Sequence, residues 1–222
     1  MRYPSGRILI FAKAPRAGQV KTRLIPEFGV QAATRLHEEM LQATVRSVSN
    51  ADLAPVQLWC APDTHHPMFH TLRREHSVTL HTQDGIDLGA RMAQAFTVAL
   101  HDASFAIALG TDWPQLDLVT VAETCAALVD GDDAVMVPAE DGGYVLLGMR
   151  RYDGHVFEGI GWGGADVMQR TRERLATLQW RWREWPSSWD LDRPEDVRRA
   201  QAIGLFPWLP PGVQSNHDTE CT

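Results

Sequence analysis

Residues 7–24 read RILIFAKAPRAGQVKTRL, and the predicted fold starts from this stretch. Residues 8–11 form a continuous apolar run, which is typical of a buried strand in a parallel sheet. A loop that contains glycine, proline and several cationic side chains follows directly. In α/β proteins such a loop presents backbone N–H groups and positive charge to phosphate groups. The stretch therefore predicts a strand that opens into a phosphate-binding loop.

A plainer interpretation of the same loop is a solvated basic turn. The sequence contains neither the Walker A pattern nor the glycine pattern of dinucleotide-binding proteins. The cations of the loop are Lys13, Arg16, Lys21 and Arg23. Composition alone does not distinguish a phosphate-binding loop from a solvated basic turn, so the choice depends on the rest of the chain.

The composition limits the class of protein. The chain has 222 residues, of which 44% are hydrophobic, and this is enough for one substantial core. A net charge of −7 argues against a nucleic-acid partner, which would require a basic stripe, and favours a small anionic ligand for the cationic loop. The three cysteines lack disulfide or metal-ligand spacing, and no apolar run is long enough to span a membrane. We therefore expect a reduced, cytoplasmic protein.

Strand-like and helix-like segments alternate along the chain. The further strands are expected at residues 55–60, 77–82, 105–109, 133–138, 142–149 and 180–185, and the helices at 29–50, 88–100, 116–129, 163–175 and 194–203. This alternation predicts an α/β fold, a three-layer α/β/α sandwich with a mainly parallel mixed sheet. One domain would span residues 1–206, and residues 207–222 would form a poorly ordered tail.

A polar segment with His65, His66 and His70 separates two of the expected strands. Adjacent histidines in a loop that contains proline lack a metal-ligand geometry. We therefore expect a polar loop there.

Acidic residues follow three of the expected strands: Asp112, the pair Glu140 and Asp141, and Asp190 with Asp192. Carboxylates at the ends of strands lie where open α/β sheets bind their ligands. Mg²⁺ is commonly held by one or two carboxylates together with phosphate oxygens. A basic loop and separated aspartates thus form the minimal set of groups for chemistry on a nucleotide polyphosphate.

Each of these acids also has an ordinary structural explanation. Asp112 precedes Trp113 and Pro114 and could be a turn aspartate. Asp141 precedes two glycines and could belong to a hairpin turn. Asp192 has the spacing of a helix cap, so the acids point to a site only in combination with the basic loop.

Four motifs in this order, FAKAPRAGQVKTRL, GTDWP, EDGGYVLLG and DLDRPED, resemble a bacterial family of glycosyltransferase-like proteins. These are described as radical-SAM/selenodomain-associated or arsenosugar-biosynthesis glycosyltransferases, and the resemblance spans roughly residues 7–203. The family belongs to the nucleotide-diphospho-sugar transferase superfamily, with phospholactate and molybdenum-cofactor guanylyltransferases among its relatives. The resemblance therefore implies the glycosyltransferase A fold.

The resemblance also implies roles for individual residues. Lys21, Arg23 and Asp112 would be catalytic, and Asp112 and Asp192 would hold a Mg²⁺ or Mn²⁺ ion. The substrate-binding residues would be Lys13, Arg16, Gly18, Gln83, Arg91, Asp141, Gly142, Gly143 and Tyr144. The chain departs from the family pattern at Gly164, where a hydroxyl residue is expected before a helix, and at Arg193, which replaces a threonine.

Together these features predict a Mg²⁺-dependent transferase that acts on a nucleotide. The cation density of the loop favours nucleotidyl transfer from a nucleoside triphosphate to a small phosphorylated acceptor, with release of pyrophosphate. The resemblance favours glycosyl transfer from a nucleotide sugar, and a catalytically inactive nucleotide-binding partner protein is a third alternative. The expected partners are the nucleotide and a small acceptor, without nucleic acid or membrane, and a homodimer is compatible with the sequence.

Overall fold

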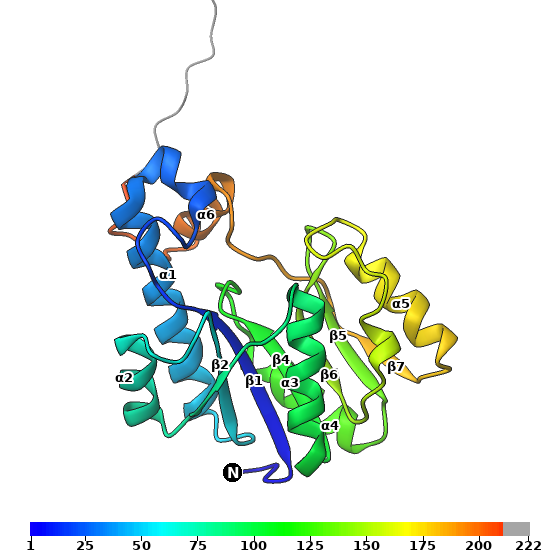
Figure 1. The fold of residues 1–222 in the computed structure, drawn as a ribbon. Coiled ribbons are helices and arrows are strands. Elements are labelled where there is room, and N and C mark those ends of the chain that lie inside the picture. Colours follow the sequence, from blue (N-terminus) through cyan, green and yellow to red (C-terminus); the bar gives the residue numbers. More distant parts are fainter. Residues whose placement is uncertain (211–222) are drawn as a thin grey trace, which may run out of the picture.

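One mixed sheet forms the centre of the computed structural model, which describes residues 1–210 (Figure 1). The sheet has the order β3-β2-β1-β4-β6-β5-β7, and β6 alone runs antiparallel to both of its neighbours. Its strands are β1 (Gly6–Lys13), β2 (Val56–Ala61), β3 (Thr79–Thr82), β4 (Phe105–Gly110), β5 (Ala134–Pro138), β6 (Tyr144–Met149) and β7 (Trp182–Glu184). This arrangement confirms the predicted mainly parallel mixed sheet.

Helices cover both faces of the sheet. They are α1 (Ile25–Asn50), α2 (Pro67–His76), α3 (Leu88–Asp102), α4 (Leu118–Val129), α5 (Val167–Thr177) and α6 (Pro194–Ala202), with short 3₁₀ turns η1 (Thr22–Leu24) and η2 (Gly154–Val156). Alternate side chains of each strand point to opposite faces, so Ile8 and Ile10 pack with α1, α2 and α4 while Leu9 packs with α3 and α5. The predicted three layers are therefore present.

A third apolar cluster lies beyond the carboxyl ends of the parallel strands. It joins the amino-terminal half of α1 to α6, which lie next to each other in Figure 1. Trp189 and Leu191, from the segment between β7 and α6, are buried in this cluster. The cluster therefore holds residues 189–191 near the strand ends.

The structure differs from the sequence prediction at α2. Residues 67–76 form a helix rather than a polar loop, because Phe69 and Leu72 lie three positions apart and are both buried. The His66 imidazole caps this helix by accepting a hydrogen bond from the Met68 N–H at 3.3 Å.

The chain end also differs from the prediction in its first residues. Leu209 is buried in the third cluster, and the Trp208 indole N–H donates to Glu39 at 2.7 Å. The Arg35 guanidinium lies 3.9 Å from the centre of the Trp208 ring. Residues 207–209 therefore pack against α1, and the remainder of the predicted tail, residues 211–222, lies outside the described part of the chain.

Two predictions about cysteines and membranes can be compared with the structure. Cys60 and Cys125 are buried and free, as predicted, and burial raises the pKa of both thiols to about 12. Within residues 1–210, no helix combines the length and apolar character that crossing a membrane requires.

The turn between β5 and β6 yields a test of the fold. Gly142 has a φ of 94°, and a Cβ atom there would lie 2.0 Å from the Ala165 carbonyl oxygen. We expect Gly142→Ala to lower the free energy of unfolding by about 3 kcal/mol, because left-handed strain and a backbone clash add together. Urea denaturation measures this change.

Gly204→Ala is the matched control. Gly204 also has a positive φ, 83°, but no atom lies within 4 Å of the added Cβ, so a loss of only about 1 kcal/mol is expected. Equal losses in the two variants would contradict the close contact between the turn and residue 165.

Candidate active site

The loop after β1 sends one lysine into the protein. Lys21 has left-handed backbone angles (φ 46°, ψ 42°) at the start of η1, and its side chain is only 3% exposed. Its Nζ lies 2.7 Å from Asp112 Oδ1 and also donates a hydrogen bond to the Leu191 carbonyl oxygen. Leu191 N–H in turn donates to the Asp112 carbonyl oxygen at 2.8 Å. Lys21 therefore joins the loop after β1, the end of β4 and the segment before α6.

A donor cleft of about 520 Å³ opens on one side of Asp112, at the carboxyl ends of β1, β2 and β4. It is lined by Lys13, Gln19, His37, Gln83, Arg91 and Asp112, together with backbone and apolar groups. The Gln83 amide donates to the carbonyl oxygens of Ala12 and Trp59, and Arg91 Nε donates to Gly85 O. Three predicted substrate-binding residues, Lys13, Gln83 and Arg91, are thus brought together in this cleft.

An acceptor cavity of about 250 Å³ opens on the other side of Asp112. Its walls come from Trp113, Tyr144 and Trp162 and from small or apolar residues of the β5–β6 turn and the loop before α5. Asp112, Asp141 and Asp190 supply its charged groups. The donor cleft and the acceptor cavity share Leu88, Gly110 and Asp112, so the two meet at the Asp112 carboxylate.

Asp190 is an unusual carboxylate. Burial, with smaller contributions from the negative charges of Asp141 and Asp112, raises the pKa of Asp190 to about 6. No ion pair reaches Asp190 or Asp141 from any other residue in the range 1–210. The acceptor cavity therefore brings together carboxylates that lack a positive partner of their own.

Asp192, the predicted second metal ligand, has a different environment. Its carboxylate pairs with Arg23, and neither residue lines the acceptor cavity or the donor cleft. The Asp196 carboxylate accepts the backbone N–H groups of Asp192 and Arg193 at 3.0 and 2.7 Å, which fixes the start of α6. Asp190 therefore shares a cavity with Asp112 and Asp192 does not, and the metal role of Asp192 remains a prediction.

Two other predicted loop residues lie away from both openings. The Arg16 guanidinium is 3.3 Å from the Asp63 carboxylate, and burial is incomplete on both sides of this pair. Gly18 has a φ of 78° and lines neither opening. Their predicted phosphate contacts remain predictions.

The two acidic residues of the turn between β5 and β6 have different contacts. Asp141 Oδ1 accepts the Gly143 N–H at 2.9 Å and faces the acceptor cavity. The Glu140 carboxylate instead forms a two-pronged pair with Arg199 of α6 at 2.7 and 3.0 Å. Gly143 and Tyr144 also line the acceptor cavity. Gly142 does not; only glycine fits this position, because φ is positive and the Ala165 carbonyl lies too close for a Cβ atom.

The carboxylates of the acceptor cavity offer oxygen atoms to a divalent cation. Asp112 Oδ1 is buried and has no hydrogen-bond partner, because the Lys21 contact at 2.7 Å lies outside hydrogen-bond geometry. Burial is the main cause of the raised pKa of Asp190 and makes the charged form of this carboxylate unfavourable, whereas Lys21 already balances the charge of Asp112. Residues 1–210 contain no group of three or more acidic, histidine or cysteine side chains arranged around a common metal position. Asp112 and Asp190 offer two carboxylates of one cavity to a Mg²⁺-type ion, which would complete its shell with phosphate oxygens, and a metal at this site remains a prediction.

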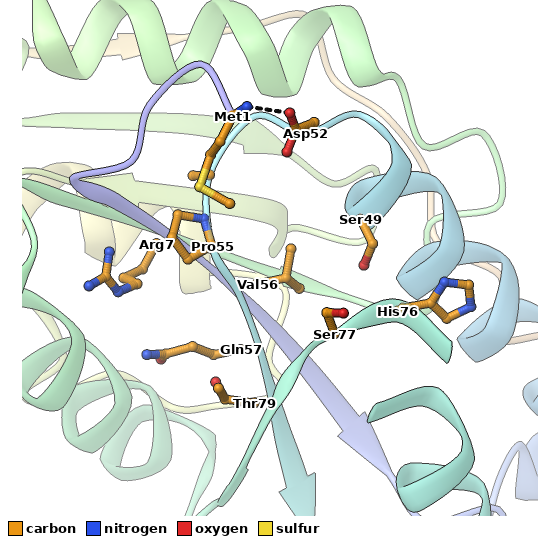
Figure 2. Close-up of a pocket in the computed structure, with 11 residues that line it drawn as sticks. Met1, Arg7, Ser49, Asp52, Pro55, Val56, Gln57, His76, Ser77 and Thr79 are labelled. Carbon is orange, nitrogen blue, oxygen red and sulfur yellow. Dashed lines mark hydrogen bonds and ion pairs between the residues drawn. The ribbon is translucent and has the colours of Figure 1, made fainter. Parts of the chain in front are cut away.

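Another cavity of about 440 Å³ lies at the amino ends of β1, β2 and β3 (Figure 2). It is lined by residues such as Arg7, Ser49, Gln57 and His76, and the Met1 amino group pairs there with Asp52. The amino ends of parallel strands are not where open α/β sheets bind their ligands. The openings on either side of Asp112 are therefore the candidate site.

Sequence reasoning missed three residues of this site. His37 of α1 lines the donor cleft, its Nε2 lies 2.9 Å from the Lys13 carbonyl oxygen, and burial lowers its pKa. Trp113 and Trp162 form walls of the acceptor cavity. Trp162 stands in the sequence GWGG, a glycine-rich signal of close packing, whereas nothing in the spacing of α1 marks His37.

A family model described as "Uncharacterized protein conserved in bacteria (DUF2064)" matches residues 44–164. None of the curated proteins matches the chain. This family match leaves the radical-SAM or arsenosugar subdivision as a prediction.

Solved structures share the fold over nearly the whole chain. A protein from Desulfovibrio desulfuricans, described as a "putative nucleotide-diphospho-sugar transferase", is 29% identical with a TM-score of 0.82 over 90% of both chains. The 4-diphosphocytidyl-2C-methyl-D-erythritol synthase of Anaerococcus prevotii is 10% identical, with a TM-score of 0.60 over 90% of this chain and 98% of that one. A nucleotidyl transferase from Methanothermobacter is 13% identical, with a TM-score of 0.58 over 90% and 97%. These likenesses confirm the predicted nucleotide-diphospho-sugar transferase fold.

The raised pKa of Asp190 predicts how stability depends on pH. Its pKa is about 6 in the folded protein and 3.8 in a model compound, so the folded state binds an extra proton between these values. Stability then falls as pH rises from about 4 to about 6. Without divalent cations, we expect Asp190→Asn to raise Tm by roughly 3 °C at pH 7 and to leave it unchanged near pH 4.

Asp192→Asn is the control for this measurement, because it removes the charge that pairs with Arg23 and should give no gain at either pH. Differential scanning calorimetry across this pH range gives the answer. A Tm at pH 7 that is the same for Asp190→Asn and the unmodified protein would contradict the crowding of carboxylates in the cavity.

Proposed function

We propose that this chain, which belongs to the DUF2064 family of bacterial proteins, is a metal-assisted glycosyltransferase that uses a nucleotide-diphosphate sugar. The position of Asp112 carries the proposal, since its carboxylate lines both the donor cleft and the acceptor cavity. A bond that is broken next to Asp112 would join phosphates in the donor cleft to a sugar at the acceptor cavity. The name of the Desulfovibrio protein, a nucleotide-diphospho-sugar transferase, is consistent with such a donor.

The number of available cations supports a diphosphate donor. Lys13 and Arg91 line the donor cleft, whereas the charges of Arg16, Lys21 and Arg23 are paired with aspartates. The prediction from the sequence counts all the cations of the first loop and therefore favours a triphosphate. The two cations that face the cleft match a nucleoside diphosphate leaving group more closely.

The chemistry then follows from the two openings. An acceptor hydroxyl oxygen forms a bond to the anomeric carbon, the bond from that carbon to the β-phosphate oxygen breaks, and the nucleoside diphosphate leaves. The hydroxyl proton passes to a carboxylate of the acceptor cavity, where Asp141 has no ion-pair partner among residues 1–210. Lys13 and Arg91 bind the departing phosphates. A Mg²⁺ or Mn²⁺ ion, held by Asp112 and Asp190, would neutralise charge on the leaving diphosphate when bound.

Nucleotidyl transfer from a nucleoside triphosphate is the second candidate. The side chains of Arg16 and Arg23 are 43% and 64% exposed, and exposed ion pairs contribute little stability. Either guanidinium can therefore leave its aspartate and bind a third phosphate.

A panel of nucleotide sugars and nucleoside triphosphates, each with Mg²⁺, tests the proposed function. We expect a nucleotide sugar to raise Tm. Its sugar should be transferred slowly to water or to an added acceptor, with release of the nucleoside diphosphate. Lys13→Gln and Arg91→Gln should each weaken donor binding about tenfold, because each removes one charge-assisted phosphate contact. Arg16→Gln is the matched control and should leave the affinity for the nucleotide sugar unchanged.

Other outcomes would contradict the proposal. Pyrophosphate release from a triphosphate would show nucleotidyl transfer instead. Nucleotide binding that is insensitive to Asp112→Asn, without turnover of any donor, would show a catalytically inactive binding protein.

A further inference from the structure

We infer that the acceptor is a hydroxyl compound without an anionic group, neutral or cationic, whose ring packs against Trp162 in the acceptor cavity. This inference rests on the proposed function, because it assigns the second substrate of the same site. It differs from the small phosphorylated acceptor that the sequence predicts.

The charge of the acceptor cavity is the first argument. Asp112, Asp141 and Asp190 line it, and no lysine or arginine is among the residues that line it in the described part of the chain. Lys21 offsets the charge of Asp112, and a metal ion held with Asp190 would be shared with the phosphates of the donor, but Asp141 has no positive partner among residues 1–210. Proteins recognise phosphate groups with arginine, lysine and free backbone N–H groups. This cavity instead favours a hydroxyl or ammonium group, which donates hydrogen bonds to carboxylates.

The amino end of α5 does not change this conclusion. Val167 starts α5 and lines the cavity, and a free helix start attracts anions. The residue before this helix, however, is Asp166, whose Oδ1 would lie 3.0 Å from a Cβ atom on Gly164. The Asp166 carboxylate pairs in turn with Arg170 at 3.3 Å, so the charges at this helix start are already balanced within the protein and offer no free cation to an anionic acceptor.

The shape of the cavity is the second argument. Trp162 lies against α3 because Gly89 has no side chain: a Cβ there would be 2.1 Å from the Trp162 indole nitrogen. The Phe157 ring, with its centre 6.1 Å away, supports the indole from another element. No atom lies within 4 Å of a Cβ added at Gly163, so the space beside this glycine, next to Trp162, is open. A fixed aromatic face next to open space and hydroxyl-binding carboxylates fits a sugar ring or an aromatic alcohol.

Trp113 provides a third observation. Its side chain lines the acceptor cavity, the residue is only 5% exposed, and its indole N–H has no hydrogen-bond partner among the described residues. A buried donor without a partner costs free energy, which an oxygen atom of a bound molecule would recover where the side chains around the indole N–H give way. The N–H group can be satisfied by a neutral hydroxyl or ether oxygen, so no anionic ligand is needed.

Matched pairs of small molecules test the inference. The probes are glucosamine, myo-inositol and tyrosol, each compared with its phosphate monoester by isothermal titration calorimetry in Mg²⁺ and the nucleoside diphosphate. We expect at least one unphosphorylated probe to bind, and its phosphate ester to bind at least tenfold more weakly. Tighter or equal binding of the phosphate ester would overturn the inference, and so would the failure of all three unphosphorylated probes to bind.

Variants connect the result to the cavity. Asp141→Asn keeps the oxygen that accepts the Gly143 N–H and removes the charge, so it should reduce discrimination against the phosphate ester severalfold. Trp162→Ala should weaken binding of the unphosphorylated probe about tenfold, and Trp162→Phe should restore most of it. Unchanged discrimination in Asp141→Asn would contradict the charge argument.

The same titrations separate this inference from the proposed function. Binding of the nucleotide sugar depends on Lys13 and Arg91, and acceptor binding depends on Asp141 and Trp162. If nucleotide sugars fail to bind or react, the proposed function fails. If they react but the phosphorylated acceptors are preferred, only the inference about the acceptor fails.

Discussion

The arrangement of the site depends on one buried ammonium group. Lys21 lies in the loop after β1, yet its Nζ contacts the Asp112 carboxylate and the Leu191 carbonyl oxygen. These groups come from segments about 90 and 170 residues away along the chain. A buried lysine that loses its partners is strongly destabilising, so these contacts fix the relative positions of the three segments. Lys21 also has left-handed backbone angles, which are uncommon outside glycine.

The main consequence of this arrangement is that the two openings beside Asp112 carry opposite charges. Lys13 at the end of β1 and Arg91 of α3 face the donor cleft. The aspartates that follow β4, β5 and β7 face the acceptor cavity. A transferase that joins a phosphorylated donor to a second substrate needs such a division, because each substrate must be bound without attracting the other into its place. The folded chain produces the division from backbone geometry, since the mixed sheet brings the ends of β1, β4 and β5 to one edge.

Much of the fold follows from local patterns in the sequence. Apolar runs identify β1, β4 and β5 directly, and an apolar stripe at helical spacing identifies α1. The helix α2 is not predicted, because only Phe69 and Leu72 mark its buried face. The site is less accessible to sequence reasoning. Asp190 and Asp192 are two residues apart in an extended segment, and only the pairing of Asp192 with Arg23 separates their roles. Trp162 acquires its place because Gly89, on another element, lacks a side chain.

The most direct test of this account is the replacement of Lys21 by methionine, with Lys13→Met as the control. The account predicts that Lys21→Met lowers the free energy of unfolding by about 2 kcal/mol or more and abolishes Mg²⁺-dependent binding of the nucleotide sugar. Lys13, by contrast, is exposed, so Lys13→Met should weaken binding while leaving stability unchanged. If Lys21→Met unfolds at the same denaturant concentration as the unmodified protein and still binds the donor with Mg²⁺, then Lys21 does not hold the site together.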